Sequence, residues 1–163
     1  MGTKSPSVTG TPGPDRTRHW DRRTNRLVVA AGSIITLCGI GHSAGALIQA
    51  APRYADAWLD GALWRSPNDD LVQMTQVTAG FWFTVYSFGI PLLMIGTTVL
   101  WCGFRGIVPS RGLAWCLAAW VAVGTAASGL SPLVLLFVAS GLMLAAAGRA
   151  RADARAAADH VPT

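Results

Sequence analysis

The sequence of 163 residues is short of charge. It contains no glutamate, Lys4 is its only lysine, and charged residues make up 13% of the chain. A soluble globular domain usually carries about 25% charged residues, and here 52% of the residues are hydrophobic. This shortage excludes an ordinary soluble domain and indicates an integral membrane protein. The composition, rich in Ala, Gly and Arg, is typical of a bacterial genome with a high G and C content.

The residues that build enzyme centres and metal sites are also scarce. The three cysteines are an odd number, which argues against a complete disulfide framework. His, Cys and Asp residues nowhere show metal-ligand spacing, and no nucleophile–base motif or phosphate-binding glycine loop occurs. We therefore predict no catalytic residue, no metal and no cofactor, and we favour a protein that is not an enzyme.

Four apolar runs are present, and only Arg111, at the start of the third, carries a charge. About 20 apolar residues are needed to span a bilayer as a helix. The runs predict an all-α fold, an integral membrane four-helix bundle of two antiparallel hairpins within residues 27–148. The third and fourth runs are short, so we expect bilayer thinning or close packing of that hairpin. The predicted helices cover about residues 27–50, 76–104, 111–128 and 132–147.

The basic residues lie outside these runs. Residues 1–26 are predicted to be a disordered basic tail, and 149–163 a second basic tail that extends the last helix into water. Eleven Lys and Arg residues lie in the tails and the 105–111 connection, against two in the loop 51–75. The positive-inside rule then places both termini in the cytoplasm, with loop 51–75 outside a bacterial plasma membrane. Because the charge flanks apolar runs, the expected partner is the lipid bilayer and not nucleic acid.

Local signals mark the ends of the helices. Ser110 is predicted to cap the third helix, and Ser131 followed by Pro132 to start the fourth. Pro91, with Gly89 before it, predicts a kink in the second helix, because proline lacks an N–H and clashes with the preceding turn.

Two stripes of small residues repeat every fourth position. Gly41 and Gly45 lie in the first helix, and Ala114, Ala118, Ala122 and Ala126 in the third. Small residues at this spacing permit close approach of two helices. The partner is either another helix of the same chain or the same helix in a homodimer.

His42 is the strongest candidate for a functional residue, because ionisable side chains within membrane spans are uncommon and often functional. It lies about 22 Å from the inner end of the first helix, in the outer half of the bilayer. Trp82 and Tyr86 in the second helix lie at a similar depth. We expect His42 to bond Tyr86, Thr84 or a backbone carbonyl, and we name His42, Trp82 and Tyr86 as the candidate ligand-binding residues. The alternative is a neutral histidine that serves packing alone.

A set of short motifs recurs in one order along the chain. It comprises a glycine-flanked His42, Phe81-Trp82-Phe83, a helix broken by Gly and Pro, Arg111-Gly-Leu-Ala-Trp115 and a Ser-Gly…Pro turn. In this order the chain resembles a bacterial membrane protein family known as domain of unknown function 6463, over about residues 27–148. The resemblance implies the four-helix topology and brings no catalytic or binding residues.

Three functions are consistent with these features. The first is a non-enzymatic membrane protein that binds a lipid or another apolar ligand near His42. The second is a membrane redox component or enzyme that uses His42 with Tyr86 or a cysteine. The third is an accessory subunit of a transport complex with membrane-protein partners. No run carries an Asp, Glu or Lys within the bilayer, which argues against ion-coupled transport by this chain alone.

Overall fold

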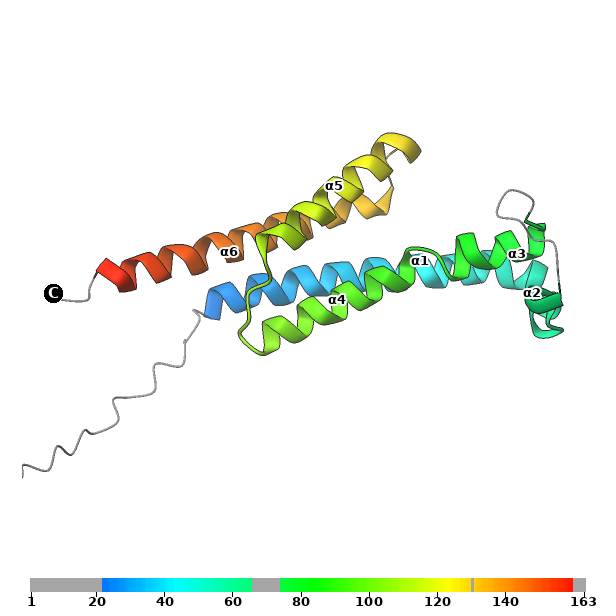
Figure 1. The fold of residues 1–163 in the computed structure, drawn as a ribbon, viewed down its shortest axis with the longest axis horizontal. Coiled ribbons are helices and arrows are strands. Elements are labelled where there is room, and N and C mark those ends of the chain that lie inside the picture. Colours follow the sequence, from blue (N-terminus) through cyan, green and yellow to red (C-terminus); the bar gives the residue numbers. More distant parts are fainter. Residues whose placement is uncertain (1–21, 66–73, 130, 160–163) are drawn as a thin grey trace, which may run out of the picture.

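The computed structural model describes residues 22–65, 74–129 and 131–159, and every regular element in this part of the chain is helical (Figure 1). The short helices α2, α3 and η1 connect or interrupt the long ones, and η2 opens α6. Four long helical segments result, so the predicted all-α fold is confirmed. The elements are α1 (Arg22–Leu59), α2 (Ala62–Arg65), α3 (Gln76–Gly80), the π-helix η1 (Phe81–Val85), α4 (Gly89–Phe104), α5 (Arg111–Ser128), the 3-10 helix η2 (Pro132–Val134) and α6 (Leu135–Asp159).

The long helices pair as two hairpins. Figure 1 shows α1 beside α4 and α5 beside α6, and the contacts agree. The hairpins join through α1 and α6, whereas α5 makes few contacts with α4. Three of the largest fully buried side chains, Ile35, Leu92 and Met143, come from α1, α4 and α6. The core therefore follows these three helices, and α5 adds Ala114, Leu117 and Val121 to it where it packs on α6.

Glycines bring α1 and α4 into backbone contact. A Cβ atom on Gly32 would lie 2.6 Å from the backbone nitrogen of Leu100, and one on Gly96 would lie 2.6 Å from that of Thr36. Such close approach is possible only without a side chain. The glycines of this contact, which we call the glycine seam, lie seven residues apart on each helix. They are Gly32 and Gly39 of α1 and Gly89, Gly96 and Gly103 of α4.

The predicted small-residue stripes are not this seam. A Cβ atom on Gly41 or Gly45 would meet nothing within 4 Å. In α5, Ala114 is buried, but Ala122 and Ala126 are exposed. The glycines that repeat every fourth residue therefore do not mark the face of α1 that packs on α4. In α5 the repeated alanines mark the buried face only at the start of the helix.

Three helical segments are long and apolar enough to cross a membrane: Arg22–Leu59, Gln76–Phe104 and Pro132–Asp159. The third predicted helix, α5, is shorter, as expected, but the fourth is not short, because α6 continues beyond residue 147. Large apolar side chains cover the outside of the molecule, with Leu37 66%, Ile48 73% and Val123 70% exposed. These features suggest membrane insertion, because hydrocarbon is the solvent that such a surface matches.

The ends of α1 differ from the prediction at both sides. The helix starts at Arg22, within the predicted tail, and continues through Pro52 to Leu59, within the predicted loop 51–75. Beyond the apolar run the helix is held by packing. The ring of Tyr54 lies against Gly80, and the indole Nε1 of Trp58 donates a hydrogen bond to the carbonyl of Val77 at 2.9 Å. Residues 1–21 of the predicted tail and 66–73 of the predicted loop lie outside the described residues.

The predicted caps of the second hairpin are confirmed. The Ser110 hydroxyl accepts a hydrogen bond from the Leu113 N–H at 3.3 Å, and α5 covers the predicted residues 111–128. The Ser131 hydroxyl accepts from the Leu133 N–H at 3.3 Å, with Pro132 as the first residue of η2. Beyond residue 147, α6 continues to Asp159, along the basic tail that was expected to extend this helix. Residues 160–163 lie outside the described part.

The second helical segment is interrupted just before Pro91. Its π-helical turn closes with a hydrogen bond from the Tyr86 N–H to the Phe81 carbonyl at 2.9 Å, and α4 begins at Gly89. Pro91 thus occupies the first turn of α4, where its missing N–H needs no partner. The predicted kink is a break between η1 and α4, and this break lies opposite His42.

Candidate functional site

His42 is bonded to the break in the second helical segment. Its Nε2 lies 2.8 Å from the hydroxyl oxygen of Ser87, and that hydroxyl donates a hydrogen bond to the carbonyl of Thr84 at 2.8 Å. The partner is therefore Ser87, and not Tyr86, Thr84 or a backbone carbonyl as predicted. The wide turn ahead of Ser87 leaves the Thr84 carbonyl free of a regular helical bond, so it can accept this hydroxyl.

This pair of hydrogen bonds fixes the tautomer of His42. The single proton of the Ser87 hydroxyl is used toward Thr84, so Ser87 must accept from His42. Neutral His42 then carries its proton on Nε2, and its Nδ1 is an acceptor. No partner for Nδ1 is found in the part of the chain that the structure describes. The site thus offers one unused acceptor.

Aromatic rings hold the imidazole on its other side. The ring of Phe88 stacks on His42 with centroids 3.8 Å apart and planes inclined by 29°. Trp120 of α5 meets Phe88 edge to face at 5.5 Å. His42 of the first hairpin is therefore linked through Phe88 to α5 of the second.

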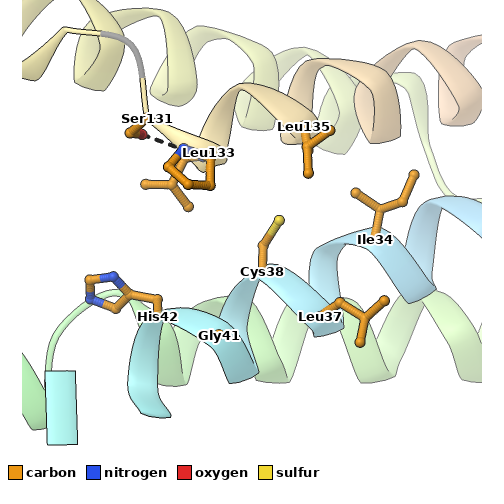
Figure 2. A pocket seen from close by; sticks show the side chains of 9 residues that line it. Ile34, Leu37, Cys38, Gly41, His42, Ser131, Leu133 and Leu135 are labelled. Carbon is orange, nitrogen blue, oxygen red and sulfur yellow. Dashed lines mark hydrogen bonds between the residues drawn. The ribbon is translucent and has the colours of Figure 1, made fainter. Parts of the chain in front are cut away.

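Two hollows meet at His42, each of about 480 Å³. They share His42, Ser131 and Leu133, and we call them together the His42 cleft. Figure 2 shows the first, with His42, Cys38 and Ile34 of α1 facing Ser131, Leu133 and Leu135 of the second hairpin. The second hollow extends along α5, where it is lined by Phe88, Trp120, Val121, Val123, Gly124, Thr125 and Ala127.

The walls of the His42 cleft are almost wholly apolar. Among the described residues that line it there is no Asp, Glu, Lys or Arg. The polar side chains are those of His42, Cys38, Ser131 and Thr125. An apolar cavity with a few converging polar groups is the usual form of a small-molecule site.

Trp82 and Tyr86 lie in a separate aromatic cluster. The Tyr86 ring stacks on Phe81 at 6.1 Å and meets Trp82 edge to face at 5.0 Å. Phe81 in turn meets Trp58 of α1 at 5.8 Å. Tyr86 is 54% exposed and Trp82 46% exposed, and neither lines the His42 cleft. Of the three candidate residues, only His42 belongs to the cleft.

The chain matches the sequence profile of one protein family over residues 26–150, most of its length. The family is described as a family of unknown function, DUF6463. The chain is a member of the DUF6463 family. No curated protein and no solved structure matches this DUF6463 chain, so its site is interpreted from its own geometry.

Metal binding finds no support in this DUF6463 structure. Within residues 22–65, 74–129 and 131–159, no group of three or more His, Cys or Asp side chains is placed to hold an ion. The cysteines Cys38, Cys102 and Cys116 are free. Cys38 precedes His42 by one helical turn and lines the same hollow, which makes two potential ligands and no third.

Sequence reasoning missed the residues that complete the DUF6463 site. Ser87, Phe88 and Trp120 position His42 or close the cleft beside it. The available signal was the Gly89 and Pro91 pair, because a broken helix leaves carbonyls and hydroxyls for a neighbouring helix to bond. Ser131 was identified only as a cap, although it also faces His42 across the cleft (Figure 2).

Proposed function

We propose that this DUF6463 protein is a multi-pass protein of the bacterial plasma membrane that binds an apolar molecule in the His42 cleft. The bound molecule carries a hydrogen-bond donor, such as the hydroxyl of a lipid alcohol or a phenol, which bonds Nδ1 of His42. The single observation that carries this proposal is the hydrogen bond between Nε2 of His42 and Ser87, which leaves Nδ1 as the accepting nitrogen in the wall of an apolar cavity.

The dimensions and chemistry of the cleft support this ligand class. Each hollow has about 480 Å³, within the range of roughly 300–1,000 Å³ of small-molecule sites. The lining offers no charged group to pair with an ionic ligand. Since the cleft has few other polar side chains, among them Ser131 and Thr125, a single polar end on an otherwise apolar ligand suits it best.

The proposed orientation has both termini in the cytoplasm. The arginines at the start of α1, in the 105–111 connection and at the end of α6 lie at one end of the molecule (Figure 1). The positive-inside rule assigns that end to the cytoplasm. The His42 cleft then opens in the outer half of the bilayer.

A redox function that uses His42 with Tyr86 receives less support. The Tyr86 phenol is engaged with Phe81 and Trp82, away from the cleft. A binding function needs only the acceptor and the apolar walls that adjoin it, so we favour binding over catalysis.

Photolabelling tests the proposal directly. The full chain is reconstituted in liposomes with a long-chain alcohol that carries an alkyl diazirine, or with the methyl ether of the same alcohol. One hydrogen bond contributes about 0.5–1.5 kcal/mol, so we expect the alcohol to label the wild type roughly two- to tenfold more than the ether. Labelling yield is measured by intact mass spectrometry, and the labelled peptides should include residues of the cleft wall.

The variant His42→Phe distinguishes specific binding of the alcohol in the His42 cleft from general partitioning of the probe into the bilayer. Phenylalanine keeps a ring that can stack on Phe88 but has no acceptor, so the preference for the alcohol should disappear. Ile48→Ala is the matched control, because Ile48 is an exposed α1 residue outside the cleft. Equal labelling of the wild type by both probes, or a preference that survives in His42→Phe, would refute the proposal.

A further inference from the structure

A second groove lies at the other end of the molecule, between the 105–111 connection and α6. It has a volume of about 490 Å³, and it shares no residue with the His42 cleft. Its polar side chains are Ser110, Arg111 and Arg151. Its apolar wall consists of Ile107, Val108, Pro109, Ala147, Ala150 and Ala154.

Arg111 is poorly satisfied by the protein itself. Its Nε is buried and has no hydrogen-bond partner in the described part of the chain. Its Nη2 lies 3.6 Å from the position of a Cβ atom on Gly148, so the guanidinium group extends over α6. A buried donor without an acceptor is costly, and for a charged group the cost is larger. Because Nε has almost no accessible surface, an anion in the groove would bond Arg111 through its Nη nitrogens.

The surroundings of Arg111 favour an anion. Arg151 lines the same groove, and no carboxylate is among the described residues that line it. Arg111 is also the first residue of α5, an 18-residue helix whose positive dipole end adds to the local potential. The other arginine of the connection, Arg105, lies over the Trp101 ring at 5.2 Å, so it belongs to a different surface.

The depth of the groove identifies the source of the anion. Trp101 and Trp115 flank the connection and are 54% and 63% exposed, as expected for indoles at the level of lipid headgroups. Basic pockets between helices on the cytoplasmic side are typical headgroup sites. The apolar wall consists of α6 alanines on both sides of Arg151 and of Val108 and its neighbours in the connection, and the glycerol and first acyl carbons of a lipid would lie against it.

We propose that this groove binds the phosphate of an anionic glycerophospholipid, held by Arg111 and Arg151. The planar guanidinium of Arg111 donates two N–H groups to phosphate oxygens in a fixed geometry. The acyl chains extend along the outside of α5 and α6. With the orientation proposed above, on which this placement rests, the lipid-recognition site lies on the cytoplasmic face and is separate from the His42 cleft.

Native mass spectrometry of the full chain in detergent tests this site. Phosphatidylglycerol and phosphatidylcholine with identical acyl chains are added in equal amounts, and the ratio of the two bound lipids is measured. We expect the wild type to prefer phosphatidylglycerol at least fivefold. Loss of a hydrogen bond between charged groups weakens binding by roughly tenfold or more, so Arg111→Gln and Arg151→Gln should each bring the ratio close to one.

Matched variants separate the groove from general positive charge. Arg149→Gln removes the same charge from an exposed α6 residue outside the groove and should leave the ratio unchanged. Arg111→Lys keeps the charge without the planar fork and should retain only part of the preference. If Arg111→Gln fails to fold, as judged by circular dichroism, the exposed Arg151→Gln carries the test alone.

Three outcomes would overturn the proposal. The first is a wild type without preference for phosphatidylglycerol. The second is an Arg149→Gln variant that loses as much preference as Arg151→Gln. The third is displacement of the bound lipid by millimolar inorganic phosphate, which would assign the groove to a soluble anion. Retention of phosphatidylglycerol under those conditions supports the lipid headgroup.

Discussion

His42 is held by side chains that carry no charge. Its chemical type and its place in an uncharged run were enough to single it out from the sequence, because an imidazole in a membrane span needs a polar partner. Its actual partner was not predictable. The prediction of a bond to Tyr86 or Thr84 assumed that both helices are regular. The π-helical turn at Phe81–Val85 instead contains one residue more than a regular α-helical turn. Ser87 therefore takes the position that a regular helix would have given to a neighbour.

The variant Ser87→Ala tests the hydrogen bond that fixes the tautomer. It removes the acceptor for Nε2 of His42, so we expect a loss of about 1 kcal/mol in the free energy of unfolding. It should also weaken the preference for the alcohol probe, since the ring is no longer oriented. Chemical unfolding in micelles measures the first effect. Thr97→Ala, at an exposed site whose hydroxyl bonds only its own helix, should change stability by less than about 0.5 kcal/mol.

The glycine seam gives a second prediction at the scale of single residues. In Gly96→Ala the new methyl group meets backbone atoms of Thr36, which cannot rotate away. Overpacking of this kind costs about 1–3 kcal/mol, so the midpoint of unfolding in micelles should fall. Gly45→Ala adds the same methyl group in open space and should be neutral or stabilising. Equal effects of the two variants would contradict backbone contact between α1 and α4.

At the scale of elements, the capped starts of the second hairpin and the ends at Phe104 and Ser128 were predictable, whereas both ends of α1 were not. Starts are set by local chemistry, and the Ser110 and Ser131 hydroxyls cap the helices that the sequence assigned to them. The C-terminal end of α1 depends on partners far along the chain. The apolar run of α1 stops near residue 50, but Trp58 and Tyr54 find partners in α3 and keep the chain helical to Leu59. No local signal reports such contacts.

Ser110→Ala should loosen the first turn of α5. The loss of an N-cap typically costs about 1 kcal/mol, and the effect should concentrate at the amide of Leu113, which donates to Ser110. Hydrogen exchange monitored by mass spectrometry should show faster exchange in the peptide that contains residues 111–115. Ser110→Thr keeps an accepting hydroxyl and should exchange nearly as the wild type does. Unchanged hydrogen exchange in Ser110→Ala would show that the Ser110 cap does not stabilise the first turn of α5.

At the scale of the whole molecule, the pairing of helices into hairpins followed from their order and short connections. The way in which the two hairpins pack against each other could not be predicted from helix order and connection length. Contact between α1 and α6, and the separation of α4 from α5, depend on which faces carry Ile35, Leu92 and Leu136. The four runs are apolar all round, so hydrophobic periodicity cannot distinguish a face toward protein from a face toward lipid. The position of the cleft was hidden for the same reason.

The proposed orientation can be measured in intact cells. In a background with Cys38, Cys102 and Cys116 replaced by serine, Asp60→Cys lies in the turn between α1 and α2, and Arg155→Cys lies near the end of α6. A thiol reagent that cannot cross membranes should label Asp60→Cys and leave Arg155→Cys unlabelled until the cells are opened. The reverse pattern would place the termini outside.

The His42 cleft is bordered by side chains that face outward, among them Leu37, which is 66% exposed, and Leu135, which is 52% exposed. The ligand that we propose would therefore enter sideways from the bilayer, and its mole fraction among the lipids would govern the occupancy of the cleft. Adding empty liposomes at constant total protein and ligand should lower photolabelling in proportion to the added lipid. The occupancy of the cleft would then depend on the density of the ligand in the membrane and hardly at all on the volume of the surrounding water.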